Sequence, residues 1–94
     1  MIKHIVFFKL KKAQDAPLVQ KALQGLKSKI TGLVSLEIGI NFSKEQRSCD
    51  IALITGFKTI QDLESYAIHP EHLKAIAKIK EKIDYTKVVD YELN

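Results

Sequence analysis

Residues 2–10, IKHIVFFKL, decide the fold of this sequence. Side chains alternate between the two faces of a strand, so the even-numbered positions share one face, which is apolar except for His4. The odd-numbered face has a lysine at each end and Ile5 and Phe7 in its middle. A face that met only water would not need Ile5 and Phe7. The stretch therefore predicts a strand that is covered on both sides.

A helix and two more strands are predicted next. Apolar residues recur at helical spacing between Pro17, which suits a first helical turn, and Gly32, which suits a helix end. Residues 33–40 alternate between apolar and small or polar side chains, which is typical of a strand. Residues 49–57 are apolar on both faces, apart from an aspartate and a threonine, and predict an inner strand. The polar segment 41–48 joins the two strands, so we expect an antiparallel hairpin.

The remaining chain predicts a broken helix and a last strand. Thr59, with Asp62 three residues later, resembles the capping box that opens a helix. Pro70 disfavours helical geometry at His69, so this helix should end or kink there, before a second helical run begins. Residues 86–93 include two valines and predict the last strand.

The element order is β-α-β-β-α-β, the ferredoxin-like arrangement of the α+β class. It predicts a four-stranded antiparallel sheet with the helices on one face, which leaves Ile5 and Phe7 on the other. The 94 residues fit a single domain, residues 1–94, whose core is only modestly stabilising by itself. A second copy that faced this sheet would cover the apolar residues. We therefore expect a homodimer whose two sheets close a dimeric α/β barrel.

Composition and charge argue against several classes of partner. The net charge of +4 comes mainly from lysine, with a single arginine, whereas nucleic-acid readers combine arginine with stacking aromatics. No run of residues approaches the roughly 20 apolar positions of a membrane span, and the apolar run near the start is too short for a signal peptide. Cys49 is the only cysteine, so it forms no disulfide within the chain. We expect a cytoplasmic protein with no nucleic-acid or membrane partner.

The densest chemistry lies in residues 66–72, YAIHPEH, which hold one of three tyrosines and two of three histidines. His72 falls on the apolar stripe of the second helical run, and Tyr66 can approach it across the break. His4, on the apolar face of the first strand, is the third candidate. The histidine can act as a general base and the tyrosine can donate a hydrogen bond to an oxyanion. The structural alternative is that His72 bonds a backbone carbonyl and Tyr66 only packs.

A metal or cofactor site is not predicted. A metal site would use His69, Glu71 and His72, with His4 as a further candidate, but neighbouring positions point in different directions, and no second cluster supplies the missing ligands. We therefore expect no metal and no cofactor.

Three stretches, IKHIVFFKLK, YAIHPEH and VVDYE, together resemble the stress-responsive A/B barrel (Dabb) domain family of the dimeric α/β barrel superfamily. The resemblance covers essentially the whole chain. It implies a homodimer with facing sheets and a cavity between the sheet and the helices of each copy. In a plant polyketide cyclase of this family, the catalytic histidine and tyrosine match His72 and Tyr66, and the histidine of the first strand matches His4.

This precedent implies cyclase-like or isomerase-like acid/base chemistry. His72 would remove a proton α to a carbonyl and Tyr66 would hold the thioester or enolate oxygen. The competing interpretation is a non-catalytic, stress-related or structural oligomer in which these residues only hold the fold. On the catalytic interpretation a small, partly apolar ligand would contact four apolar side chains: Val6, Phe8, Leu23 and Ile76.

Overall fold

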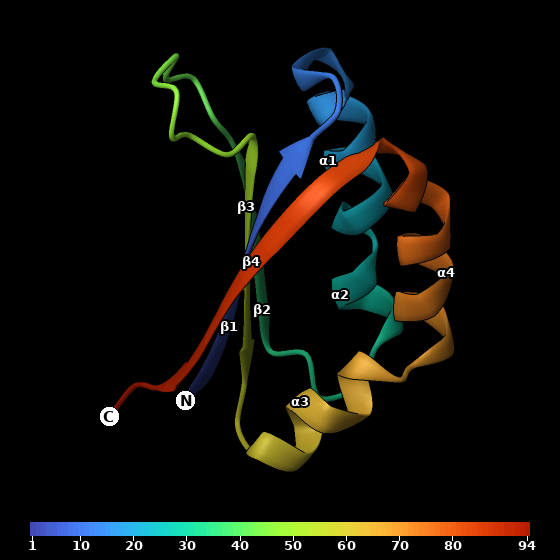
Figure 1. Cartoon of the computed structure of the whole chain (residues 1–94). Coiled ribbons are helices and arrows are strands. Elements are labelled where there is room, and N and C mark those ends of the chain that lie inside the picture. The colour runs from blue at the N-terminus through green and yellow to red at the C-terminus, as the bar shows by residue number, and fades with distance from the viewer.

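The computed structural model describes residues 1–94, and its elements follow the predicted order. Four antiparallel strands form one sheet in the order β2-β3-β1-β4, and the helices lie together on one face of it (Figure 1). The predicted α+β, ferredoxin-like architecture is therefore confirmed. The strands are β1 (Ile2–Leu10), β2 (Ser35–Ile40), β3 (Ile51–Phe57) and β4 (Ile83–Glu92).

The first helical region is divided at Gly25, which corrects the single helix that the sequence predicts. Glycine stabilises a helix less than any residue except proline, and here it separates two helical segments. The helical region ends at Lys29, before the predicted stop, and Gly32 lies in the following turn with φ of 96°, a left-handed conformation that glycine adopts without strain. The helices are α1 (Ala16–Gln24), α2 (Leu26–Lys29), α3 (Ile60–Ala67) and α4 (Pro70–Ile79), with short 3-10 turns η1 (Ala13–Asp15) and η2 (Lys80–Lys82).

The break between α3 and α4 falls at Pro70, as predicted. The Thr59 side chain caps α3 by accepting a hydrogen bond from the Asp62 N–H at 3.1 Å. His69 has extended backbone geometry, and its Nδ1 accepts from the Glu71 N–H at 3.1 Å, so its ring caps α4. His69 therefore belongs to the helix break.

The core fills the space between the sheet and the helices. The register between the inner strands sets the even-numbered face of β1 against the buried side chains of β3. The two polar residues of that core are satisfied, because Thr55 donates to the His4 carbonyl and Asp50 accepts from the Leu10 N–H. On the opposite face, Ile5 is half-buried and Phe7 keeps 39% of its surface exposed. This face carries apolar side chains that nothing in the chain covers.

Replacing Asp50 with alanine should reduce the free energy of unfolding by about 1–3 kcal/mol, because a buried donor loses its partner. The Asp50 carboxylate accepts from the Leu10 N–H at 2.7 Å, and both residues are buried. Asp50→Asn keeps an acceptor oxygen at this position and should cost less. Urea denaturation of the two variants measures the difference, and equal losses would contradict the assigned role of the hydrogen bond.

Candidate functional site

The candidate site is a cluster of aromatic rings at the end of the sheet that lies near α3 (Figure 1). Tyr66 of α3 lies at its centre, with ring centroids 4.4 Å from His72 of α4 and 6.2 Å from His4 of β1. Phe57, the last residue of β3, packs on Tyr66 at 5.2 Å. The structure therefore brings together the three residues that the sequence singles out.

The hydroxyl of Tyr66 is buried and has no hydrogen-bond partner. The residue is 1% exposed, and burial raises the pKa of the phenol to about 12. Tyr66 is therefore neutral near pH 7 and holds a proton that it can donate. Leaving such a group without a partner costs about 1–3 kcal/mol, so the site has a strong preference for an acceptor oxygen beside it.

His72 is held in one tautomer by the helix break. Its Nδ1 lies 3.1 Å from the Ala67 carbonyl oxygen, which only accepts, so Nδ1 carries the proton. The lone pair of the neutral ring is then on Nε2. Burial lowers the pKa of His72, the Ala67 hydrogen bond opposes this, and the nearby His4 and His69 lower it further. His72 is thus kept in the form that can accept a proton.

His4 is paired with Asp90 of β4, a residue that sequence reasoning missed. The Nδ1 of His4 bonds the Asp90 carboxylate, because the register between β1 and β4 sets the two residues directly opposite. The carboxylate fixes the ring orientation of His4 and leaves its Nε2 as the free nitrogen. No sequence pattern predicts the register between β1 and β4. The only available signal was that Asp90 lies two residues from Val88, and therefore on the same strand face.

The predicted ligand contacts lie in or against the packed core. Val6, Phe8 and Leu23 are among its buried residues, and Ile76 packs against them. Two hollows of about 340 and 360 Å³ lie at the other end of the sheet, around the loop between β2 and β3, and neither is lined by the three clustered residues. A ligand that contacts the Tyr66 hydroxyl therefore requires side chains around it to move, and the four contacts remain predictions.

The lowered pKa of His72 predicts a pH dependence of stability. The unfolded histidine titrates near pH 6.5, and the folded one titrates lower, so the unfolded state binds more protons between these two values. The contribution of the neutral ring is present above about pH 6.5 and is lost as the pH falls through the folded pKa. Melting temperatures from about pH 7.5 to 5 should fall less for His72→Gln than for the wild type. Parallel curves would contradict the assignment.

No helix is both long and apolar enough to span a membrane. The chain also contains no cluster of three or more side chains that could ligate a metal.

Solved structures share this fold over nearly the whole chain. A dimeric protein of unknown function from Bacteroides fragilis is 32% identical, with a TM-score of 0.86, over 98% of this chain and 95% of its own. A Dabb family protein from Mesorhizobium loti is 22% identical, with a TM-score of 0.77, over 99% and 96%. A hydroxynitrile lyase from Passiflora edulis is 15% identical, with a TM-score of 0.83, over 99% and 93%.

None of the curated proteins matches this sequence. The family model for the Stress Responsive A/B Barrel Domain, Dabb, matches residues 2–93. This match spans both ends of the sheet and every residue of the aromatic cluster, so the chain belongs to the Dabb family.

Proposed function

We propose that this protein binds a small, partly apolar molecule beside Tyr66 and uses His72 to move a proton on it. The observation that carries the proposal is the Tyr66 hydroxyl, which is buried without a partner on a ring that packs near two imidazoles. Buried side-chain polar atoms almost always have a partner in native proteins, so this exception calls for a reason. A ligand oxygen that accepts from the hydroxyl supplies one.

The geometry suits proton transfer next to a carbonyl group. A carbonyl oxygen that accepts from Tyr66 would develop negative charge as Nε2 of His72 removes a proton from the neighbouring carbon. Return of the proton to a different carbon isomerises the molecule, and attack of the carbanion on a second carbonyl within it closes a ring. On this proposal His4, whose ring is oriented by Asp90, would shuttle the second proton.

The proposal also includes a second copy of the chain. The sheet face opposite the helices exposes apolar side chains, and a 94-residue domain gains stability from any partner that buries them. The 32% identical relative from Bacteroides fragilis is described as dimeric. These observations support a homodimer in which the two sheets face each other.

A hydroxynitrile lyase with this fold supports the choice of an enzymatic function, because it shows that the fold accommodates a catalyst. At 15% identity this likeness concerns the fold alone. The candidate reaction for the present chain therefore rests on its own residues.

One observation favours a second candidate, a non-catalytic oligomer. Tyr66 is 1% exposed and Phe57 is fully buried, so the centre of the ring cluster is packed and not open. The hydrogen bond from His72 to the Ala67 carbonyl is also what a purely structural histidine would make. On this reading, the cluster stabilises the junction between α3, α4 and the sheet.

Exchange of an α-proton for deuterium separates the two candidates. The probe is a short β-keto acyl thioester of N-acetylcysteamine, incubated with the protein in D₂O and followed by proton NMR. Exchange above the buffer rate, together with shifts in the ring signals of Tyr66 and His72, supports the proposed chemistry. Ring signals that stay unchanged at millimolar thioester, with no excess exchange, would favour the structural oligomer.

A further inference from the structure

The sheet face without helices divides into a small half and a large half. Residues that lie directly opposite on neighbouring antiparallel strands point to the same face. The row through Phe7 of β1 continues to Ala52 of β3 and Gly39 of β2, so it is bulky at one end and nearly flat at the other. The row through Lys3 repeats the division, with large residues on β4 and β1 and small ones on β3 and β2: Tyr91, Lys3, Gly56 and Ser35. The row between these two is large on all four strands: Val89, Ile5, Ile54 and Glu37.

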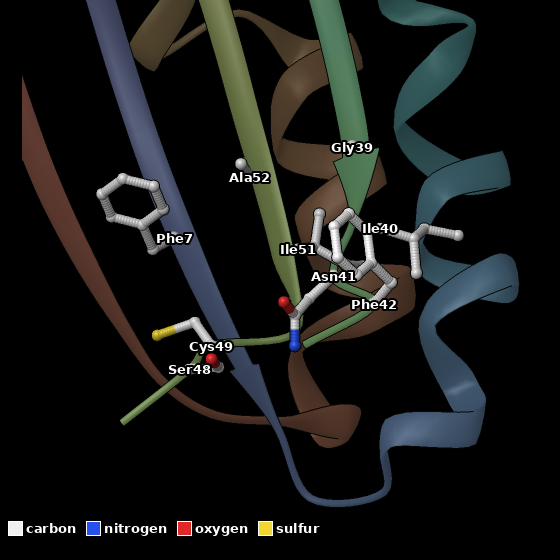
Figure 2. Close-up of a pocket in the computed structure, with 9 residues that line it drawn as sticks. All are labelled: Phe7, Gly39, Ile40, Asn41, Phe42, Ser48, Cys49, Ile51 and Ala52. Atoms are coloured by element: carbon white, nitrogen blue, oxygen red, sulfur yellow. The ribbon is translucent and has the colours of Figure 1, made fainter. Parts of the chain in front are cut away.

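The small half is hollowed. A hollow of about 360 Å³ lies here, and Figure 2 shows its lining residues, with Gly39 and Ala52 on adjacent strands and Phe7 on the strand next to Ala52. Phe42, in the loop after β2, lines the opposite side and is 96% exposed. The hollow therefore has a mainly apolar lining, with Asn41 and Ser48 as polar members, and opens on the face that the chain leaves uncovered.

Charge follows the same division. The large half carries three lysines on this face, at positions 3, 9 and 87, whereas β2 and β3 contribute none. The small half instead carries Glu37, in the row between those of Phe7 and Lys3. The two halves thus complement each other in charge, and in shape at the rows through Phe7 and Lys3.

We propose that Phe7 of one copy seats in the hollow over Gly39 and Ala52 of a second copy, and that the reverse contact forms at the same time. The large half of each sheet then lies over the small half of its partner, and the two-fold axis runs along the strands. This inference rests on the homodimer proposed above and adds which surfaces meet.

Two-fold symmetry allows one other orientation of the two sheets, and the distribution of side chains on this face disfavours it. An axis between two facing sheets can run along the strands or across them. An axis across the strands places large half against large half, so that the exposed aromatics and the lysines of both copies oppose each other. The same arrangement sets hollow against hollow. An axis along the strands fills both hollows and brings Glu37 towards the lysines of the other copy.

Filling the hollow tests the proposal directly. A Cβ atom added at Gly39 meets nothing within 4 Å, so Gly39→Leu fits the isolated chain but occupies the space proposed for Phe7. We expect the dimer dissociation constant, measured by sedimentation, to rise at least about tenfold, the change that follows from losing about 1.4 kcal/mol. Gly25→Leu is the matched control on the helical layer, where an added Cβ has only the Lys29 side chain nearby.

Exchanging a large and a small side chain between Phe7 and Gly39 tests which residue fills the hollow. Phe7→Ala alone should also weaken the dimer, whereas Phe7→Ala combined with Gly39→Leu should dimerise more tightly than Gly39→Leu alone, because leucine then takes the vacated space. Additive losses would overturn the pairing of Phe7 with Gly39. A Gly39→Leu protein that sediments like the wild-type dimer would show that the hollow holds something other than the second copy. A wild-type monomer at micromolar concentration would remove the homodimer itself, independently of the chemistry at His72.

Discussion

Tyr66→Phe is expected to make the protein more stable and less active. The substitution removes the hydroxyl that is buried without a partner and keeps the ring that packs on Phe57 and His72. Recovering the desolvation cost of that group should add about 1 kcal/mol to the free energy of unfolding, with an upper range of about 3 kcal/mol. For a domain of this size, each kcal/mol corresponds to a rise of about 4–8 °C in Tm.

The same substitution should lower the rate of α-proton exchange about 10²–10³-fold, the typical effect of removing one oxyanion donor. Thermal melts and the deuterium-exchange assay, run on the same preparations, measure both quantities. Stability and activity moving in opposite directions is the signature of a group retained for function at the expense of the fold.

Tyr85→Phe provides the matched control. It removes a phenol from the sheet face opposite the helices, away from the ring cluster, and should leave the exchange rate unchanged; a change in its Tm would report on the proposed dimer interface and not on the Tyr66 site. A Tyr66→Phe protein that melts well below the wild type would show that the hydroxyl has a partner in solution. The proposed ligand site beside Tyr66 would then lose its main support.

Much of the fold could be predicted from the sequence because the patterns that determine it are local. The alternation in residues 2–10, the Thr59 cap and the break at Pro70 each depend on a few consecutive residues, and all are found where they were predicted. The division at Gly25 was missed because the apolar spacing continues through it. The pattern records which side chains face the core, and α1 and α2 present the same face on both sides of the glycine.

The site was only partly readable because its contacts are long-range. Helical spacing placed His72 on an inner face, but the partnership of His4 and Asp90 joins residues 86 positions apart and depends on strand register. A shift of the register by one residue would turn Asp90 to the other face of the sheet. The closed packing around Tyr66 is equally invisible in the sequence, because it depends on how three elements meet.

His72→Gln should lower the rate of α-proton exchange by about 10²–10⁴, the usual contribution of a general base. Glutamine can still donate a hydrogen bond from its amide to the Ala67 carbonyl, so the helix break keeps its contact while the basic nitrogen is lost. The structural candidate predicts something different, because a side chain that only satisfies Ala67 is replaced here by one that does the same. The structural candidate predicts either that His72→Gln exchanges the α-proton at the wild-type rate, or that neither protein exchanges it faster than buffer does.

His69→Asn is the control for His72→Gln, because it removes a neighbouring histidine and leaves the proposed base in place. His69 caps α4 through its Nδ1, and asparagine is also a favourable helix cap, so His69→Asn should keep both the fold and the exchange rate. If His69→Asn lowers the rate as much as His72→Gln does, the effect comes from a displaced α4 and not from a missing base. If only His72→Gln lowers it and both variants melt near the wild-type temperature, proton transfer is assigned to Nε2 of His72. Tyr66 then has a defined partner in catalysis, because its ring packs against the same imidazole at 4.4 Å.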